Sequence, residues 1–396
     1  MMDFICFSLN NWEERKARKQ QFMLALSLRE DVSKVLYVEP PLNFFRLLLL
    51  PFLELRTLAN RKRWLRALKF RIENLADSQK LFIFTPVFFI PFSFRVQSIY
   101  NLNCYFSYLI VKLKIRKLDF KNIVLWLYHP FDYCLLRWFK EKKVSCFDWA
   151  EDWAAYFEEF HSKKRRKVHS LEEKIIKGAD IIFVVSKFLL ERAKKINSNS
   201  YQILDGTTPE IFANFDGKIP DDMRSIRHPI LGFSGTVFHR LDIDLIRELS
   251  LYLPDCSIVL VGNVLLRKRE LEKINRDNIF LLGAKEYKQL PAYLMNFDAC
   301  LVPYIISTFT SPPTKIYDYL ATGKPIIATS SPELEGFGNL IRLAKTKEQF
   351  IASVRDSLCE DDPNLRSLRI KKAYENSWLK RTDELIGIIK TVRPGT

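Results

Sequence analysis

The stretch "TSPPTKIYDYLATGKPIIATS", residues 310–330, joins the pattern of a helix directly to that of a short strand. Ser311 or Thr310 can cap the helix, and Pro312 suits its first position. The apolar run that follows has the composition of a buried strand. Because a helix leading straight into a buried strand is the repeating unit of parallel sheets, this stretch predicts an α/β fold.

The same alternation extends over most of the chain, with longer helical patterns between short apolar runs. It lapses at residues 205–229, where Gly, Pro, Asp and Asn cluster as in a linker. The expected strands are KVLYVEPP (34–41), KLFIFTP (80–86), NIVLWLYHP (122–130), KVSCFDW (143–149), ADIIFVVS (179–186), PILGFSGT (229–236), SIVLVGN (257–263), NIFLLGA (278–284), ACLVPY (299–304) and KPIIATS (324–330).

We therefore predict two doubly wound, Rossmann-like domains. The first covers residues 1–204, a linker covers 205–229, and the second covers 230–375. Residues 376–396 are expected to form a C-terminal helix, and the pattern leaves open whether that helix returns to the first domain.

The composition excludes several classes of protein. A length of 396 residues and a hydrophobic content of 48% suit two globular domains rather than disorder. The 7 cysteines lack metal-site spacing, so a reducing compartment is expected. The N-terminus lacks the pattern of a signal peptide. Residues 42–53 and 81–94 are apolar but fall short of the ~20 residues that a membrane-spanning helix needs.

The formal net charge of +16 is unevenly spread. Residues 1–200 hold 36 Lys and Arg against 21 Asp and Glu, a net of +15, and the remainder is close to neutral. Residues 46–71 interleave basic and apolar residues, which is typical of an amphipathic helix on an anionic membrane surface. A solvated face, or attraction to nucleic acid, is the alternative for this run and for "SKKRRKVHS" (162–170). No nucleic-acid-binding module is recognisable, so we expect no nucleic-acid partner.

Ligands of parallel sheets bind beyond the carboxyl ends of strands, so residues just after strands are the candidates. At the strand and turn of residues 229–236, Gly232 and Gly235 can let backbone N–H groups approach a phosphate, and Arg240, which follows, can pair with a diphosphate. Residues 310–322 offer Ser311 and Thr314 at a helix start and the ammonium of Lys315. Asp318, one turn on, can accept two hydrogen bonds from a ribose diol. The alternative is a solvated Lys315–Asp318 pair, which the apolar surroundings disfavour.

The first half offers a second group of candidates. Asp148, Glu151 and Asp152 crowd together among aromatic residues, which raises a carboxyl pKa and suits a general base. The alternative is a helix N-terminus that favours acidic residues. His129 follows a strand and is a candidate substrate contact, base or capping residue.

Three segments of the second half together resemble the donor-binding domain of GT-B glycosyltransferases of the group 1 type. They are ILGFSGTVFHRLDIDLIRELSLYLPDCSIVLVGN (230–263), NIFLLGAKEYKQLPAYLMNFDACLVPY (278–304) and SPPTKIYDYLATGKPIIAT (311–329). The first half is similar to a subgroup that acts in bacterial cell-surface polysaccharide synthesis, including teichuronic-acid-type enzymes. KVLYVEPP, FTPVFFIPF (84–92), WLYHPFDY (126–133) and FDWAEDWAAY (147–156) carry this likeness.

The resemblance implies two domains facing across a cleft and sugar transfer from a UDP- or GDP-linked donor, with no cofactor and no essential metal. Lys315 would contact the diphosphate, Arg240 falls in the phosphate loop, and Asp318 stands where relatives have a ribose-binding glutamate. Asp152, Glu151 and His129 remain the catalytic candidates. Thr310 stands where many relatives have an acidic residue. Whether the transfer retains or inverts the anomeric configuration therefore stays open, and so do the donor sugar and the base of the donor nucleotide.

The acceptor implied is a saccharide, often lipid-linked, held by the first domain. The protein is then expected in the cytoplasm, peripheral on the inner face of the cell membrane. Two other interpretations stay open: a non-catalytic membrane-associated scaffold on the same fold, and a nucleotide-sugar epimerase, which would need no basic amphipathic segment.

Overall fold

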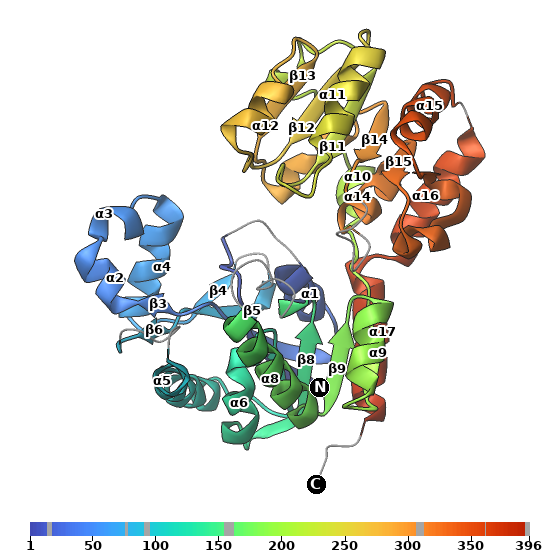
Figure 1. Ribbon diagram of the computed structural model, residues 1–396. Coiled ribbons are helices and arrows are strands. Elements are labelled where there is room, and N and C mark those ends of the chain that lie inside the picture. Colours follow the sequence, from blue (N-terminus) through green and yellow to red (C-terminus); the bar gives the residue numbers. More distant parts are fainter. Residues whose placement is uncertain are drawn as a thin grey trace. The chain divides into compact units, whose positions relative to one another are not determined.

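A computed structural model describes residues 1–13, 18–75, 78–90, 96–153, 162–305, 313–360 and 362–392 of the chain. The chain divides into two compact units (Figure 1). The first consists of residues 1–204 together with the segment from Thr382 onward, and the second of Asp205–Arg381. Each unit is built on its own parallel sheet.

The sheet of the first unit has the order β10-β9-β8-β7-β1-β2-β5-β4. Its pairs are parallel except for β4 with β5. The strand order reverses at β1, which lies between β2 and β7, so the carboxyl ends of these strands form a switch point. The strands are β1 (Met2–Phe7), β2 (Val32–Val38), β4 (Glu73–Leu75), β5 (Ser78–Phe84), β7 (Ile123–Leu127), β8 (Lys142–Trp149), β9 (Ile181–Val184) and β10 (Ser200–Gln202), beside the short pair β3 (Leu42–Asn43) and β6 (Val87–Phe88).

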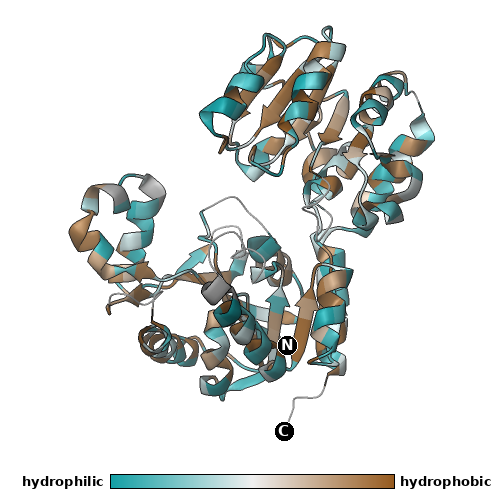
Figure 2. Cartoon of the chain, in the orientation of Figure 1, coloured by the Kyte–Doolittle hydropathy of each residue, from teal (hydrophilic) through white to brown (hydrophobic). Residues whose placement is uncertain are grey.

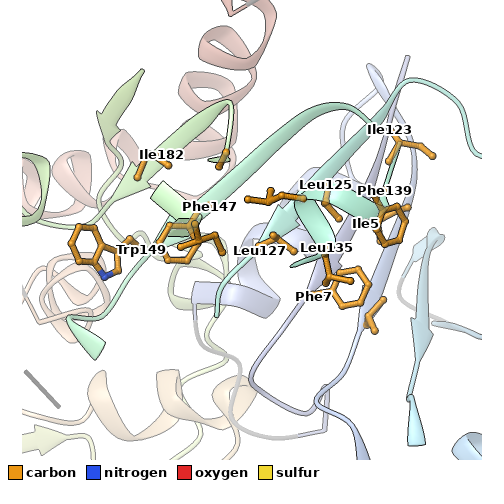
Figure 3. Close-up of a cluster of buried hydrophobic side chains, with 14 of the residues drawn as sticks. Ile5, Phe7, Ile123, Leu125, Leu127, Leu135, Phe139, Phe147, Trp149 and Ile182 are labelled. Carbon is orange, nitrogen blue, oxygen red and sulfur yellow. The ribbon is translucent and has the colours of Figure 1, made fainter. Parts of the chain in front are cut away.

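Helices cover both faces of this sheet. On one face, alternate residues of β1 and β7 such as Ile5, Phe7 and Leu125 form a core with α5, α6, α8 and α9 (Figure 3). On the other face, Phe22 of α1 packs 6.3 Å from the Trp126 ring. The helices are α1 (Arg18–Ser27), α2 (Phe44–Leu49), α3 (Pro51–Glu54), α4 (Leu58–Leu68), α5 (Gln97–Lys117), η1 (Pro130–Asp132), α6 (Tyr133–Trp138), α8 (Ser162–Gly178), α9 (Lys187–Lys194) and α17 (Trp378–Thr391).

The second unit repeats this design with the strand order β13-β12-β11-β14-β15-β16, all parallel. The order reverses between β11 and β14. Its strands are β11 (Ile230–Ser234), β12 (Ser257–Val261), β13 (Ile279–Gly283), β14 (Ala299–Val302), β15 (Ile326–Thr329) and β16 (Arg342–Ala344). Its helices are α10 (Glu210–Ala213), η2 (Asp221–Met223), α11 (Ile243–Tyr252), α12 (Lys268–Lys273), η3 (Tyr287–Gln289), α13 (Leu290–Leu294), α14 (Lys315–Thr322), η5 (Pro332–Leu340), α15 (Lys347–Leu358) and α16 (Pro363–Glu375).

The stretch that predicted the fold forms α14 and β15. Gly323 ends the helix with a left-handed φ of 71°, a conformation that glycine adopts without strain. The predicted α/β class is confirmed. Residues 205–229 are not a free connection, because Thr207 is buried and pairs with Ser377 inside the second unit.

One further segment differs from the expectation, and another resolves what the sequence left open. Residues 46–71 form the three helices α2, α3 and α4 rather than one amphipathic helix, since Asn43 caps α2 and Pro51 starts α3. From Thr382 onward, the C-terminal helix α17 belongs to the first unit, where Arg29 donates to Asp383 and the Lys390 ammonium lies 2.9 Å from Asp31. These contacts settle where the chain's last helix packs.

Gly232 has a packing role rather than the phosphate-binding role that the sequence suggested. It lies in the middle of β11, and a Cβ at this position would lie 2.0 Å from the Phe297 ring. The absence of a side chain at Gly232 therefore lets the Phe297 ring pack closely against β11.

Gly232→Ala should destabilise the second unit by about 1–3 kcal/mol, because the added methyl overlaps Phe297. Urea unfolding followed by circular dichroism measures this. Gly387→Ala is the matched control: Gly387 lies in α17, and a methyl added there would meet open space, so this change should stabilise by about 0.5–1 kcal/mol. An unchanged midpoint for Gly232→Ala would contradict the packing role.

Candidate functional site

A buried ammonium lies at the switch point of the second unit. Lys315, the first residue of α14, is 6% exposed. Its Nζ lies 4.3 Å from the Phe233 ring centroid and 4.5 Å from that of Tyr304, and it donates a hydrogen bond to the Tyr304 hydroxyl. Aromatic faces attract a cation through their quadrupole. The end of β11, the residues after β14 and the start of α14 therefore hold one positive charge at the carboxyl edge of the sheet.

Gly235 makes this arrangement possible. A Cβ at Gly235 would lie 2.8 Å from the Lys315 Nζ, and its φ of 148° disfavours other residues. Both residues were predicted from the sequence as donor contacts, and the structure places them against each other. The pair sets a fixed cation against a backbone position that has no side chain, an arrangement suited to a phosphate group.

Asp318 is buried one turn along α14. Its Oδ1 accepts hydrogen bonds from the Thr207 hydroxyl at 2.6 Å and the Tyr287 hydroxyl at 3.1 Å. Burial, and then the Asp318 charge, raises the pKa of Tyr287, so its hydroxyl stays protonated and keeps donating. Asp318 thus binds two hydroxyl groups, as a carboxylate facing a diol would, but both belong to the protein. Its role toward a ribose stays a prediction.

The remaining donor-site candidates are exposed or undescribed. Thr314 and Arg240 are exposed, and the Arg240 guanidinium lies 5.9 Å from the Phe238 ring centroid. The Arg240 carbonyl accepts from the Ile305 N–H at 2.9 Å, which ties this loop to the end of β14. Ser311 lies outside the described residues. Arg240 is thereby held at the same edge of the sheet as Lys315.

The predicted cluster of carboxylates in the first unit does not crowd together. Asp148 is fully buried, whereas Glu151 is half exposed. Each carboxylate has its own cation, because basic residues of α1 and α9 pack against the end of β8. The ion pairs are Asp148 with Arg18 at 3.0 Å, Glu151 with Lys19 at 3.7 Å and Asp152 with Arg192 at 2.5 Å. Like-charge crowding, the reason for proposing them as bases, is therefore not their environment, and a catalytic role for Asp152 or Glu151 stays a prediction.

A cavity of about 720 Å³ opens instead at the switch point of the first unit. The ends of β1, β2 and β7 supply one side of it, and residues of β6, α5, η1, α6 and α8, with Pro86 after β5, also line it. Most of its walls are apolar, including Phe88 and Phe131, while Glu39, His129 and Asp132 bring polar groups to it. Concave apolar pockets with a few converging polar groups are the usual form of a small-molecule site.

His129 enters this cavity as a neutral ring. Burial, with a contribution from Lys19, lowers its pKa to about 3. The ring stacks on Phe131 at 4.7 Å and meets Trp153 edge-on at 5.1 Å, and its buried Nδ1 has no hydrogen-bond partner among the described residues. A ring with this pKa accepts or donates hydrogen bonds at neutral pH but is a weak base, which favours a binding role over a catalytic one.

Asp132 was missed by the sequence analysis, although it lies in the quoted segment WLYHPFDY. It is 8% exposed, and its Oδ1 accepts a hydrogen bond from the Tyr100 hydroxyl at 2.7 Å. Burial raises its pKa to about 7, and the Tyr100 hydrogen bond opposes this rise. The sequence signal that could have identified Asp132 was its position three residues after His129, just past the end of a strand. No sequence signal pointed to Tyr100, which lies inside α5.

Among the described residues, no group of three or more His, Cys, Asp and Glu side chains could hold a metal ion. Within the same part of the chain, no helix is both long and apolar enough to cross a membrane.

Asp132→Asn should change how stability depends on pH. Because the folded state raises this pKa, the native protein binds the proton more tightly than the unfolded chain, and its stability falls as pH rises from about 4 to about 7. The substitution removes this loss and keeps an acceptor for Tyr100. The variant should be more stable than wild type by about 2–4 kcal/mol above pH 7, with the difference vanishing below about pH 4. Chemical unfolding across this range measures it, and an equal difference at every pH would contradict the raised pKa.

Searches of known structures find the same fold over nearly the whole chain. The sucrose-phosphate synthase of Thermosynechococcus elongatus matches with a TM-score of 0.67 and 13% identity, covering 98% of both chains. An E. coli trehalose-6-phosphate protein bound with UDP-2-fluoro glucose matches with a TM-score of 0.69 and 10% identity over 99% of this chain and 100% of that one. Anabaena HepE in complex with UDP and glucose gives a TM-score of 0.65 and 11% identity, covering 99% and 100%. These likenesses establish the GT-B fold that the sequence predicted.

Sequence comparison adds a curated relative and a family. The Bacillus subtilis protein TuaH, named as a teichuronic acid biosynthesis glycosyltransferase, is 29% identical over 180 residues, which are 43% of this chain and 45% of that protein. The matched stretch thus spans less than half of that relative. The family "Glycosyl transferases group 1" matches residues 228–359, which hold β11, α14 and the Lys315 site. The chain therefore carries a group 1 glycosyltransferase domain and adopts the GT-B fold.

Proposed function

We propose that the protein transfers a sugar from a nucleotide-sugar donor to a hydroxyl group of a lipid-linked saccharide in cell-surface polysaccharide synthesis. The observation that carries this proposal is the ammonium of Lys315, buried at the switch point of the group 1 domain. The resemblance to a protein named for teichuronic acid biosynthesis supports the class of product.

The second unit binds the donor in this proposal. The diphosphate sits against Gly235, Lys315 and the first turn of α14, where the ammonium and the positive end of the helix dipole favour negative charge. When the bond between sugar and phosphate breaks, negative charge builds on the departing diphosphate, and a fixed cation lowers the barrier. The exposed Arg240 adds a second positive charge at the edge of this donor site. This supply of charge supports a reaction without an essential metal. UDP in two of the similar structures supports a uridine or comparable nucleotide.

The first unit meets an anionic membrane in this proposal. Large apolar side chains are exposed on α2 and α3, where Leu49 is 76% and Phe52 is 92% exposed. A second exposed set follows helical spacing along α5, and both regions appear brown in Figure 2. Basic residues flank these helices, so the surface suits acidic lipid headgroups. The α5 set is Leu102, Tyr105, Phe106, Leu109 and Leu113, and the exposed basic residues are Arg56, Arg61, Lys62, Lys69, Arg71, Arg116 and Lys117.

Binding of this surface to acidic lipids would explain the positive charge of the first unit. It also supports a location on the inner face of the cell membrane. Arg63 and Arg66 do not contribute, since both turn inward to the buried carboxylate of Glu39. The basic residues of α4 therefore form two groups. Arg63 and Arg66 pair with Glu39 inside the unit, and only the outward-facing residues contact lipid.

Lys315→Met should weaken binding of UDP or GDP about 10- to 100-fold, because it removes a charge-assisted contact while keeping the buried stem. Calorimetry with each nucleoside diphosphate measures the affinity. Lys345→Ala, at an exposed lysine of the same unit, is the control and should bind as wild type does. Equal affinity in Lys315→Met and wild type would remove the basis of the proposed function.

Leu49→Ser combined with Phe52→Ser should reduce binding to vesicles that contain acidic phospholipid at least tenfold, since two exposed apolar side chains no longer enter the interface. Vesicle co-sedimentation measures the bound fraction, and added salt should weaken wild-type binding. Leu251→Ser, at a 44% exposed leucine of α11, is the matched control. Unchanged binding by the double variant would contradict this membrane surface.

A further inference from the structure

Two aromatic rings meet around the Lys315 ammonium. Phe233 lies in β11 and Tyr304 lies two residues after the end of β14, and their ring centroids are 6.0 Å apart with the rings nearly perpendicular, at 84°. The Lys315 Nζ lies 4.3 Å from the first centroid and 4.5 Å from the second. It also donates a hydrogen bond to the Tyr304 hydroxyl. Tyr304 therefore contacts the ammonium with both its ring and its hydroxyl.

The backbone around Tyr304 is fixed by the loop that follows β11. Tyr304 forms an isolated antiparallel bridge with this loop. On one side of the bridge, the Asp242 N–H donates to the Pro303 carbonyl at 2.9 Å. On the other side, the Ile305 N–H donates to the Arg240 carbonyl at 2.9 Å. The ring that contacts the ammonium is therefore tied to the loop that carries Arg240.

The backbone of α14 is anchored by residues other than Tyr304. The buried Tyr319 hydroxyl accepts a hydrogen bond from the Ser234 N–H at 2.7 Å, which joins the helix to β11. At the far end of the helix, the Arg369 guanidinium donates to the Gly323 carbonyl at 3.3 Å. These contacts fix the helix itself. What the contact with Tyr304 adds is control of a flexible lysine side chain that starts from this helix.

We propose that Tyr304 is a positioning residue of the donor site: its ring and hydroxyl hold the Lys315 ammonium beside Gly235, where the diphosphate of the nucleotide sugar binds. The inference rests on the proposed function and adds a residue that the sequence analysis did not identify. In the sequence Tyr304 only ends the apolar run ACLVPY, so no local pattern distinguished it.

A lysine that is held in place binds an anion more tightly than one that is free. Its long side chain has many rotamers, and the freedom lost on binding lowers the affinity. When the folded protein has already restricted the side chain, that loss does not recur at binding. A phenol is also a suitable holder, because it is a neutral acceptor at neutral pH and does not cancel the lysine charge. A carboxylate in its place would do so, as Asp148 does for Arg18.

The binding test compares Tyr304→Phe, which keeps the ring, with Tyr304→Leu, which removes both the ring and the hydroxyl. Calorimetry measures the affinity for UDP and GDP, and for uridine and guanosine, which have no phosphate. Tyr304→Phe should weaken nucleoside diphosphate binding by about 3- to 10-fold and Tyr304→Leu by about 10- to 50-fold, because the ammonium loses one contact and then both. The affinity for the nucleosides should stay within about twofold of wild type.

The matched control is Tyr252→Phe, which removes the hydroxyl of a tyrosine in α11 that is 60% exposed. This variant should bind each nucleotide and nucleoside as wild type does.

A double-mutant cycle shows whether Tyr304 acts through Lys315. In the Lys315→Met background there is no ammonium to hold, so adding Tyr304→Phe should change the affinity for the nucleoside diphosphate by less than about 1.5-fold. A tyrosine that only supported the fold would weaken binding in both backgrounds, and it would weaken the binding of nucleosides and nucleoside diphosphates alike.

A further measurement needs no ligand. Acetylation by an N-hydroxysuccinimide ester, followed by mass spectrometry, gives the rate at which each lysine amine reacts. Lys315 should react slowly in wild type, because it is buried and held. In Tyr304→Leu its rate relative to the exposed Lys345 should rise at least about threefold, since the side chain is released. Tyr252→Phe should leave this ratio unchanged.

The possible results separate the inference from the proposed function. Nucleoside diphosphate binding that is unchanged or tighter in Tyr304→Phe overturns the inference, and so do equal losses for nucleosides and nucleoside diphosphates. Unchanged acetylation of Lys315 in Tyr304→Leu overturns it as well. If the wild type binds neither UDP nor GDP, the proposed function fails, and the acetylation rates alone then decide whether Tyr304 holds Lys315.

Discussion

One constraint of the fold decides where both units can bind a ligand. In each sheet the strand order reverses beside the first strand, and a space opens there at the carboxyl ends of the strands. In the first unit, helices flank β1 and β7 and leave the cavity between their ends. In the second, the end of β11 and the residues after β14 enclose Lys315. The groups named in our proposals owe their convergence to this geometry, because residues far apart in the chain meet only at the edge where strands end.

The protein keeps charged groups in apolar surroundings in two ways. Asp148 and Glu39 are matched by arginines, as buried carboxylates usually are. Lys315 lies against the aromatic faces of Phe233 and Tyr304 and donates to the Tyr304 hydroxyl, which are uncharged groups. Asp132 is stabilised by a neutral phenol, so its proton stays exchangeable near neutral pH. The two kinds of buried charge differ in whether the partner is charged or neutral, not in the depth of burial.

Sequence reasoning succeeded for the fold, because alternating apolar runs and helical patterns predicted the two sheets. Turn and cap chemistry, which is read within a few residues, singled out the residues after β11 and at the start of α14, and their role toward a donor stays a prediction. Sequence reasoning failed where long-range packing decides. Gly232 was taken for a phosphate contact, but its neighbour is Phe297. The carboxylates near residue 150 looked crowded, but α1 and α9 bring each one a cation.

Local patterns in the chain were sufficient for the α/β class, the two-sheet organisation, the basic character of the first half, and Gly235 and Lys315 as a candidate anion site. Which carboxylate lies beside a cavity follows from the folded arrangement alone. Asp132 and Tyr100 are 32 residues apart and come from different helices, and no local pattern joins them. Burial and partner identity set the chemistry of a titratable group, and both are fixed by packing between elements that are distant in sequence.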